Sequence, residues 1–366
     1  MRDMTRITRQ LPTIIELREA GAKVIILAHL GRPNNEYDPA LSLSTLVDPL
    51  SEALGGVEVK FGLDCVGLEA HTATENMQNG DVVLLENLRF HPQEKANNAA
   101  FVSALAALGE VYVNDAFSCS HRAHASIVGL AERLPHAAGR LMQTELETLE
   151  SIFEQPKRPF GAVVGGAKIS TKLEMLDHLV QKVDKLIIGG AMAHTFLKAQ
   201  GHEVGKSLYE PELVEMAENI LAHADENGCE IILPVDVVTT TEFAAHAANE
   251  VVSVSAIDDD KMALDIGMAS LMTMADTVAQ CETILWNGPM GAFETSPFDA
   301  GTIMLARAVA YHTKQGDLHS VAGGGDTVAA LSHSGLFDQF SYLSTAGGAF
   351  LEWIEGKPLP GVAALG

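Results

Sequence analysis

The chain has 366 residues, of which 47% are apolar, and its formal charge at pH 7 is −24. The length suggests about two domains, and the apolar fraction supports packed cores, which excludes a disordered protein. The negative charge excludes nucleic acid and anionic membranes as partners, because both would be repelled over the whole surface.

Short apolar runs alternate with helical patterns along the whole chain. The predicted strands, in chain order, are 23–28, 82–85, 111–113, 162–164, 185–188, 231–234, 283–286, 319–322 and 342–344. The predicted helices are 41–54, 99–108, 140–154, 171–180, 210–224 and 298–312. Continuous apolar strands separated by helices are typical of parallel sheets that are covered on both faces. The predicted fold is therefore α/β and doubly wound.

One amphipathic helix marks a domain boundary. It covers about 140–154 and is followed by Gln155-Pro156-Lys157-Arg158-Pro159, in which two prolines around a basic pair end the helix. The sequence predicts an N-terminal α/β domain over 1–140, an interdomain helix over 141–155 and a C-terminal α/β domain over 156–351.

The first part of the chain is rich in arginine. Residues 1–140 carry 12 Lys and Arg against 17 Asp and Glu, and nine of those 12 cations are Arg. Residues 141–366 carry 12 against 31, and only Arg158 and Arg307 are arginines. Because the planar guanidinium group fits carboxylate and phosphate oxygens, this distribution indicates a small anionic ligand in the N-terminal domain.

Cationic side chains follow three predicted strands of that domain. They are His29 and Arg32 after 23–28, Arg89 after 82–85 and Arg122 after 111–113, with Arg6 upstream of the first predicted helix. Ligands of open α/β sheets bind beyond the carboxyl ends of the strands. Each Arg taken singly is typical of a surface ion pair, but together the guanidinium groups repel one another unless an anion lies among them. The pattern predicts a basic pocket for a small polyanion.

Three glycine-containing turns follow strands of the C-terminal domain. They are Gly165-Gly166-Ala167-Lys168, Gly189-Gly190-Ala191-Met192 and Gly323-Gly324-Gly325-Asp326-Thr327. A strand, a glycine turn and a helix start present backbone N–H groups and the positive end of a helix dipole, which suits phosphate. Lys168 and Lys172 add positive charge to the first of these turns. The alternatives are close packing at the glycines and an ordinary helix cap at Asp326-Thr327. A carboxylate beside a phosphate needs a bridging cation, so a phosphate site here implies Mg²⁺ at Asp326.

The four cysteines, Cys65, Cys119, Cys229 and Cys281, form no C-x-x-C pair, and no signal peptide is evident. These features predict a cytoplasmic protein with no zinc site. The longest apolar run, 186–197, is too short to span a bilayer, so no membrane partner is expected.

Many of these stretches resemble the phosphoglycerate kinase family, in the family's order and from residue 5 to the end of the chain. The matching stretches are Thr5-Arg6-Ile7 with Leu11-Pro12-Thr13-Ile14, His29-Leu30-Gly31-Arg32-Pro33, Leu85-Glu86-Asn87-Leu88-Arg89-Phe90, Asn114-Asp115-Ala116-Phe117, His121-Arg122-Ala123-His124, Gly165-Gly166-Ala167-Lys168, Gly205-Lys206-Ser207-Leu208, Leu285-Trp286-Asn287-Gly288-Pro289-Met290-Gly291-Ala292-Phe293-Glu294, Gly323-Gly324-Gly325-Asp326-Thr327 and Ser344-Thr345-Ala346-Gly347-Gly348-Ala349.

The resemblance implies a two-lobed kinase with a cleft between two Rossmann-like domains. One lobe would hold 3-phosphoglycerate or 1,3-bisphosphoglycerate and the other Mg-ADP or Mg-ATP, with Mg²⁺ as the cofactor. By similarity, the triose site consists of Arg6, His29, Leu30, Gly31, Arg32, Arg89 and Arg122. By similarity, the nucleotide site consists of Gly166, Lys172, Gly189, Gly190, Asn287, Pro289, Glu294, Gly324, Gly325, Asp326 and Thr327.

The resemblance also assigns roles. Arg6, Lys168, Gly325 and Gly348 would surround the transferring phosphoryl group, and Asp326 would hold the metal. The family's last segment returns to the N-terminal lobe, which predicts that 352–366 packs there. The family also suggests a monomer.

Two departures from the family pattern stand out. Family members begin with an extra strand that carries an Arg-x-Asp-x-Asn-x-Pro motif, whereas only residues 1–4 precede the first match here. We expect a gap inside the first sheet, and either a natural start further upstream or an impaired variant that only binds Mg-ADP or Mg-ATP. The second departure is Ala346, which stands where the family usually has a glycine close to the transferring phosphate.

Overall fold

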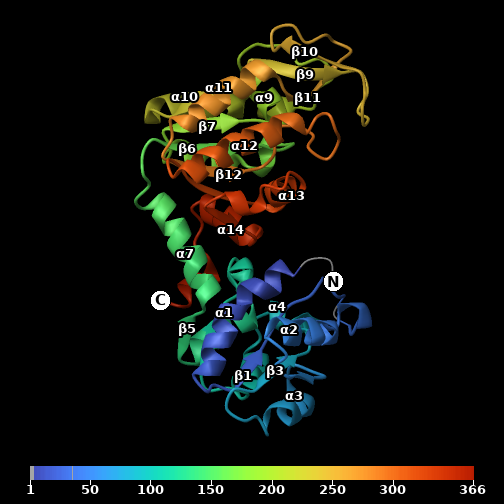
Figure 1. Cartoon of the computed structure of the whole chain (residues 1–366), viewed down its shortest axis with the longest axis vertical. Helices are drawn as coiled ribbons and strands as arrows, with labels where there is room; N and C mark the ends of the chain where they lie inside the picture. Colours follow the sequence, from blue (N-terminus) through green and yellow to red (C-terminus); the bar gives the residue numbers. More distant parts are fainter. Residues whose placement is uncertain (1–3, 35) are drawn as a thin grey trace. The chain divides into compact units, whose positions relative to one another are not determined.

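The computed structural model describes residues 4–34 and 36–366 and divides the chain into two units (Figure 1). Unit 1 comprises Met1–Glu147 and Pro358–Gly366, and unit 2 comprises Thr148–Lys357. The division falls within α7 (Arg140–Phe153), the helix that the sequence predicts as a connector. Both units are built from parallel strands and helices, so the predicted α/β fold class is confirmed.

Unit 1 contains two small parallel sheets. Its strands are β1 (Val24–Ile26), β2 (Val59–Gly62), β3 (Val82–Leu85), β4 (Tyr112–Asn114) and β5 (His136–Ala138). Its α-helices, besides the first half of α7, are α1 (Thr5–Glu19), α2 (Val47–Ala53), α3 (Gly67–Thr74), α4 (Pro92–Lys95), α5 (Ala99–Ala106), α6 (Leu130–Arg133) and α15 (Pro360–Ala363). One sheet has the order β1-β3-β2, and the other pairs β4 with β5. Within the described residues, β1 and β4 therefore belong to different sheets.

The central strand of the larger sheet explains why unit 1 needs helices on both faces. Val82 and Leu84 of β3 pack into a cluster with side chains of α1 and α2. Val83 and Leu85 point the opposite way, into a cluster with side chains of α5. Because successive strand residues alternate between faces, an unbroken apolar run fills two cores at once.

Unit 2 contains one large parallel sheet with the order β14-β13-β12-β6-β7-β8. Its strands are β6 (Phe160–Val164), β7 (Lys185–Ile188), β8 (Glu230–Ile232), β12 (Thr283–Asn287), β13 (His319–Gly323) and β14 (Tyr342–Ser344). The helices of unit 2 are α8 (Leu173–Val180), α9 (Met192–Ala199), α10 (Val214–Asn227), α11 (Met268–Ala279), α12 (Ala300–Gln315), α13 (Gly325–His333) and α14 (Gly348–Ile354). Because all six strands are parallel, the turns after β6, β7, β12 and β13 share one edge of the sheet.

A second sheet in unit 2 was not predicted. It is antiparallel, with the order β10-β9-β11, and consists of β9 (Asp236–Thr240), β10 (Asn249–Ser253) and β11 (Met262–Ile266). Four of the five β10 residues are exposed, so this strand lacks the apolar run on which the strand predictions depend.

One predicted helix differs in kind from the observed segment. The predicted helix 41–54 is helical in the α sense only over α2, and two 3₁₀ turns, Pro39–Leu41 and Leu43–Leu46, precede it. The side chains of Asp38 and Ser42 cap these turns, and buried Glu86 accepts hydrogen bonds from Ser42 Oγ and Leu43 N.

The return to unit 1 begins later than predicted, at Pro358 and not at Glu352. The reason is that α14 continues to Ile354 and Lys357 forms an ion pair with Glu174 in unit 2. Gly361 N then donates to Ser120 O at 2.8 Å, within unit 1.

Candidate active site

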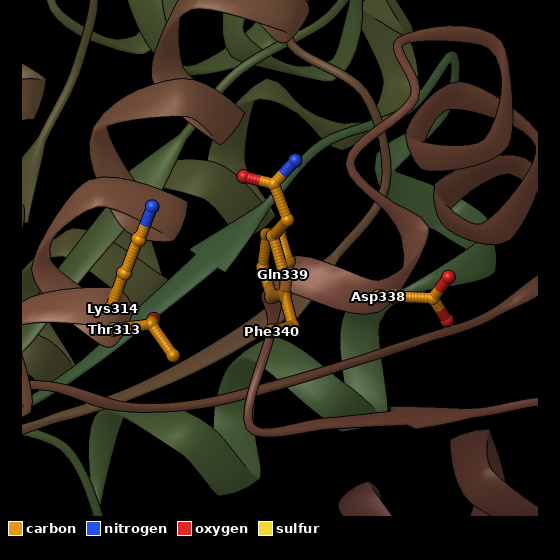
Figure 2. A pocket seen from close by; sticks show the side chains of 5 residues that line it. All are labelled: Thr313, Lys314, Asp338, Gln339 and Phe340. Carbon is orange, nitrogen blue, oxygen red and sulfur yellow. The ribbon is translucent and has the colours of Figure 1, made fainter.

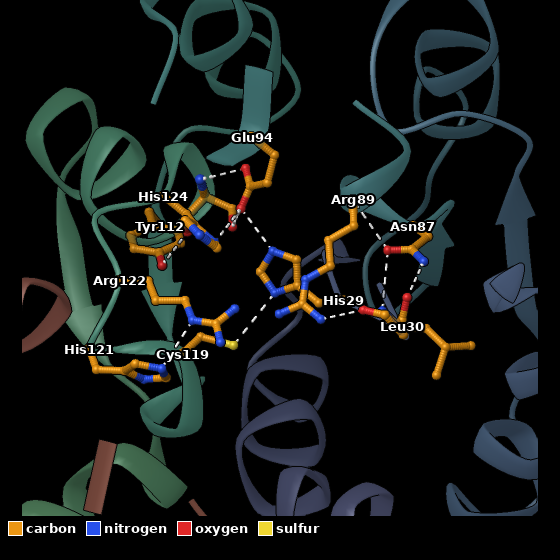
Figure 3. A network of polar contacts seen from close by, with 12 residues as sticks. His29, Leu30, Asn87, Arg89, Glu94, Tyr112, Cys119, His121, Arg122 and His124 are labelled. Carbon is orange, nitrogen blue, oxygen red and sulfur yellow. Dashed lines mark hydrogen bonds and ion pairs between the residues drawn. The ribbon is translucent and has the colours of Figure 1, made fainter. Parts of the chain in front are cut away.

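The loop that follows β1 is fixed by the loop that follows β3 (Figure 3). Leu30 N donates to Asn87 Oδ1 at 3.2 Å, and Asn87 Nδ2 donates back to Leu30 O at 2.7 Å. Arg89 Nη1 donates to Gly31 O at 2.6 Å. Gly31 has a φ of +62°, which favours glycine over any other residue. The backbone of this loop therefore lies directly beside the Arg89 guanidinium group.

His29 is a buried imidazole that is held at both ring nitrogens. Its Nε2 lies 2.8 Å from Glu94 Oε1, and its Nδ1 lies 3.6 Å from Cys119 Sγ. Burial lowers the pKa of His29, but the contacts with Cys119 and Glu94 outweigh burial and raise this pKa to about 9. His29 is therefore an imidazolium at neutral pH.

Glu94 is the carboxylate that holds His29. It is fully buried, and its two oxygens also accept hydrogen bonds from Ser126 Oγ at 2.6 Å and from Ser126 N at 3.1 Å. Although burial opposes ionisation, the bonds with His29 and Ser126 keep the pKa of Glu94 below its ordinary value. Sequence analysis missed Glu94, because a short polar helix such as α4 is typical of a solvated surface and only the fold brings it to His29.

A second histidine completes this cluster. His124 is buried, and its Nδ1 lies 3.8 Å from Glu94 Oε1 without a hydrogen-bond partner in the described residues. Burial lowers the pKa of His124 to about 4, so this ring is neutral. The donor atoms of His29, Glu94 and His124 lie within 4.8 Å of one another, a spacing that a transition metal can use. Both Glu94 oxygens are already engaged, so we assign no metal to this cluster.

Three guanidinium groups, those of Arg32, Arg89 and Arg122, add to the charge of His29. We call these four residues the cationic centre of unit 1. Burial lowers the pKa of Arg89. Cys119 raises this pKa, whereas the charges of Arg122 and Arg32 lower it further. Arg122 Nε donates to His121 Nε2 at 3.0 Å. Arg32 is exposed and forms no hydrogen bond or ion pair with another described residue. Mutual repulsion among these cations is relieved when an anion lies between them.

Arg6, the fifth predicted cation, lies on a helix and not after a strand. Arg6 is exposed on the first turn of α1, and no hydrogen bond or ion pair joins it to His29, Arg32, Arg89 or Arg122 in the described part of the chain.

In unit 2, the turns after β6, β7 and β12 touch one another through their backbones. Gly190 N donates to Met290 O at 2.9 Å, and Gly165 N donates to Asn287 O at 2.9 Å. Gly190 has a φ of +68°, and a Cβ placed there would lie 2.6 Å from Gly166 N. A side chain on Gly165 would overlap the carbonyl of Pro289. Close packing therefore requires glycine at these positions, which is the alternative that the sequence left open. The backbones of the three turns lie against one another at the carboxyl edge of the sheet.

Lys172 connects the turns after β6 and β12. Its Nζ donates to Gly165 O at 2.6 Å, to Asn287 O at 3.0 Å and to Asn287 Oδ1 at 2.5 Å. Burial lowers the pKa of Lys172 to about 8, against the favourable charge of Asp326. Lys168 is exposed at the start of a 3₁₀ turn. The two lysines therefore differ: the ammonium group of Lys172 is saturated by protein oxygens, and that of Lys168 is open to solvent.

The turn after β13 begins α13. Gly324 has a φ of +96° and precedes the helix, and Asn287 Nδ2 donates to Gly323 O at 2.7 Å. Gly288 N donates to the Thr327 hydroxyl at 2.7 Å. Gly325 and Asp326 are exposed on the first turn, so the Asp326 carboxylate stands at the positive end of the helix dipole.

The remaining predicted residues of unit 2 differ in exposure. Pro289 and Gly189 are buried, whereas Glu294 and Gly348 are exposed. Gly348 begins α14. Ala346, which departs from the family pattern, is buried and donates its N–H to Ser344 Oγ at 3.2 Å.

Two surface hollows of unit 2 lie away from these turns. One, of about 410 Å³, is lined by Thr313, Lys314, Asp338, Gln339 and Phe340, whose polar groups do not converge (Figure 2). Another is lined by residues such as Lys157, Glu282 and Leu318, which precede β6, β12 and β13. These residues mark the amino ends of the strands, whereas ligands of parallel sheets bind at the carboxyl ends.

Unit 1 carries a cationic centre, and unit 2 carries glycine turns that Lys172 connects. Together with the α/β folds of both units, these features are typical of an anion-binding phosphotransferase. The sequence model of the family described as phosphoglycerate kinase matches residues 1–357. The chain belongs to the phosphoglycerate kinase family, and the predicted family and enzyme class are confirmed.

Individual relatives agree with this assignment. A phosphoglycerate kinase of Methylorubrum extorquens is 56% identical over 363 residues, which cover 99% of this chain and 90% of that protein. A structure of phosphoglycerate kinase from Coxiella burnetii superimposes with a TM-score of 0.91 at 41% identity, covering 100% of this chain and 91% of that one. The enzyme from Pyrococcus horikoshii superimposes with a TM-score of 0.84 at 29% identity, covering the same shares of the two chains. No helix in the described residues is long and apolar enough to cross a membrane.

Proposed function

We propose that unit 1 binds the triose and unit 2 binds Mg-ADP or Mg-ATP in the reversible transfer of a phosphoryl group between 1,3-bisphosphoglycerate and ADP. The kinase reaction follows from membership of the family; the division of ligands and the residue roles are the proposal. The observation that carries it is the cationic centre of unit 1, in which Arg89 Nη1 donates to Gly31 O of the loop after His29. Burial lowers the pKa of Arg89, and the charges of Arg122 and Arg32 lower it further. Such a centre favours a ligand with more than one negative charge.

The triose site consists of side chains and backbone from four segments. Arg32, Arg89, Arg122 and the His29 imidazolium supply positive charge, and Leu30 and Gly31 supply the backbone of the loop that Asn87 holds. A phosphoglycerate carries a carboxylate and a phosphate, and guanidinium groups bind both through paired N–H donors. Arg6 would face the reacting carboxyl end from α1.

The nucleotide site consists of the turns at the carboxyl edge of the large sheet. Gly166, Gly189 and Gly190 would border the base, Asn287 and Pro289 would lie beside it, and Glu294 would reach the ribose. The phosphates would face Gly324, Gly325, Thr327 and the start of α13, where N–H groups and the helix dipole favour anions. Lys172 positions this site, since its ammonium group holds the turns after β6 and β12 together.

Asp326 suits Mg²⁺. Its carboxylate is exposed beside the proposed phosphate positions, and Mg²⁺ in such sites takes one or two carboxylates together with phosphate oxygens. When bound, the metal would neutralise charge that develops on the phosphates during transfer.

Transfer itself needs positioning and positive charge more than covalent help. The transition state spreads negative charge over three oxygens, and the exposed ammonium group of Lys168, the Arg6 guanidinium and the N–H groups of Gly325 and Gly348 would stabilise that charge. Because the ligands belong to different units, we propose that hinge bending brings them together and excludes water. The free state of all four cysteines supports a cytoplasmic location. We also propose that the protein is a monomer, which light scattering tests.

Isothermal titration calorimetry tests the division of ligands. Arg89→Ala should weaken 3-phosphoglycerate binding at least tenfold, as expected for loss of a charge-assisted contact, and should leave Mg-ADP binding unchanged. Asp326→Asn should do the reverse. Parallel losses of both ligands in either variant would contradict the proposal. Binding of Mg-ADP without any binding of 3-phosphoglycerate by the parent chain would favour the alternative of a protein that only holds the nucleotide.

A further inference from the structure

Cys119 differs from the other three cysteines of the chain. Cys65, Cys229 and Cys281 are buried, and burial raises the pKa of each thiol, to about 12 for Cys229 and to about 11 for Cys281. Cys119 is partly exposed at the end of a 3₁₀ turn, next to the cationic centre of unit 1 (Figure 3). Cys119 is therefore the one cysteine of the four that is not buried.

Cys119 belongs to a chain of three functional groups. Its Sγ lies 3.6 Å from His29 Nδ1, and His29 Nε2 lies 2.8 Å from Glu94 Oε1. Glu94 is in turn fixed by two hydrogen bonds from Ser126. A nucleophile beside an imidazole, which a carboxylate orients, is the arrangement that activates cysteine in nucleophilic enzymes.

The surrounding charges favour the thiolate. Burial raises the pKa of Cys119, but the hydrogen bond with His29, the charges of His29 and Arg89 and a hydrogen bond with Ser118 outweigh burial, so that the pKa is lower than usual. Tyr112 on β4, the strand that precedes Cys119, is a further titratable group that interacts with this thiol. Burial raises the Tyr112 pKa, so its hydroxyl is neutral and adds no negative charge.

We propose that Cys119 is a reactive thiolate that small hydroperoxides oxidise, and that its modification closes the anion site of unit 1. The thiolate sulfur attacks one oxygen of hydrogen peroxide, the S–O bond forms and the O–O bond breaks. The departing hydroxide takes a proton from the His29 imidazolium and leaves as water. Cys119 is oxidised to a sulfenic acid and the peroxide is reduced.

The consequence for the site follows from the position of the sulfur. An added oxygen on Cys119 occupies space beside His29 and Arg89, the groups that we assign to the triose anion. Oxidation therefore competes with 3-phosphoglycerate, and bound 3-phosphoglycerate shields the thiol. This second half of the inference rests on the proposed function, whereas the reactivity of Cys119 does not.

Alkylation kinetics test the reactivity. The native full chain is treated with iodoacetamide at pH 7, and the modified cysteines are quantified by peptide mass spectrometry. Cys119 should react more than about a hundredfold faster than Cys281, because burial raises the pKa of Cys281 from an ordinary 9.0 to about 11, whereas the pKa of Cys119 is lowered. Glu94→Gln removes the carboxylate that keeps His29 charged and should slow alkylation about tenfold. The matched control is Asp64→Asn, which removes the partner that lies 2.7 Å from His91 in the same unit and should leave the Cys119 rate unchanged.

Peroxide inactivation tests the closure. Hydrogen peroxide should abolish 3-phosphoglycerate binding in the parent chain, dithiothreitol should restore it, and Cys119→Ser should keep its own starting affinity. Excess 3-phosphoglycerate should protect Cys119 from iodoacetamide. Alkylation of Cys119 no faster than that of the buried cysteines, in the parent chain itself, would overturn the inference whether or not the variants fold. Fast alkylation without loss of triose binding or protection would overturn the closure while leaving the division of ligands standing.

Discussion

Gly190→Ala is the change that tests most sharply how the nucleotide turns are built. A Cβ at this position would lie 2.6 Å from both the N and the O atoms of Gly166 and 3.1 Å from Pro289 O, whereas carbon–oxygen contacts normally begin at about 3.3 Å. The turns after β6 and β7 must then separate by several tenths of an ångström. The separation weakens the hydrogen bonds from Gly190 N to Met290 O and from Met192 N to Gly166 O, at 2.9 and 3.0 Å.

The expected cost has two parts. Gly190 has a φ of +68°, and an L side chain in this left-handed region costs about 1–2 kcal/mol. Overpacking costs about a further 1–3 kcal/mol, so we expect a loss of about 3 kcal/mol in the free energy of unfolding. Gly228→Ala provides the control, because Gly228 has a φ of +70° and no atom within 4 Å of the built Cβ. That variant carries the conformational cost alone.

Urea unfolding followed by tryptophan fluorescence measures the difference. Both tryptophans of the chain, Trp286 and Trp353, lie in unit 2, so the signal reports on the unit that carries the change. Gly190→Ala should unfold at a lower urea concentration than Gly228→Ala and should bind Mg-ADP more weakly, whereas Gly228→Ala should bind it like the parent. Equal unfolding midpoints for the two variants would refute the close approach of the turns.

Three further predictions concern the ligands. Arg32→Ala should weaken 3-phosphoglycerate binding about tenfold or more and leave ADP binding unchanged; calorimetry showing equal losses would contradict the assignment. Triose affinity should fall as the pH rises through about 9, where the raised pKa of His29 lets the imidazolium lose its proton. The contribution of charged His29 to the stability of the fold has the same pH dependence: it is complete below the unfolded pKa of about 6.5 and is lost as the pH rises through about 9. A flat profile of triose affinity from pH 7 to 10 would contradict the role of His29. Asp326→Asn should abolish the gain in ADP affinity that Mg²⁺ provides while preserving metal-free ADP binding, and an unchanged magnesium dependence would move the metal elsewhere.

The sequence predicted those parts of the fold in which local pattern and burial coincide. β3, β7, β12 and β13 consist almost entirely of buried residues around an apolar run, and each was predicted within one residue of its observed ends. β10 is almost entirely exposed, and all three residues of β5 are exposed. The pairing of such strands depends on partners distant in the chain, so no local pattern reveals them.

The candidate site divides in the same way. His29 and Arg89 follow β1 and β3 of one parallel sheet, so the topology of that sheet is enough to bring them to one edge. Arg122 follows β4, which belongs to the other sheet of unit 1, so its place beside Arg89 depends on how the two sheets pack. Glu94 carries no such signal, and its role becomes visible only when the fold places a buried carboxylate 2.8 Å from His29. The saturation of Lys172 by protein oxygens was equally hidden, because hydrogen bonds to backbone carbonyls leave no mark on the sequence.

Transfer of phosphate by the chain itself tests the central claim most directly. ATP, Mg²⁺ and 3-phosphoglycerate are mixed with the purified full chain, and formation of 1,3-bisphosphoglycerate is followed through its reduction by a coupled dehydrogenase. The account predicts turnover that requires all three components and that falls in both Arg89→Ala and Asp326→Asn. A parent chain that binds Mg-ADP and 3-phosphoglycerate yet produces no acyl phosphate would contradict it.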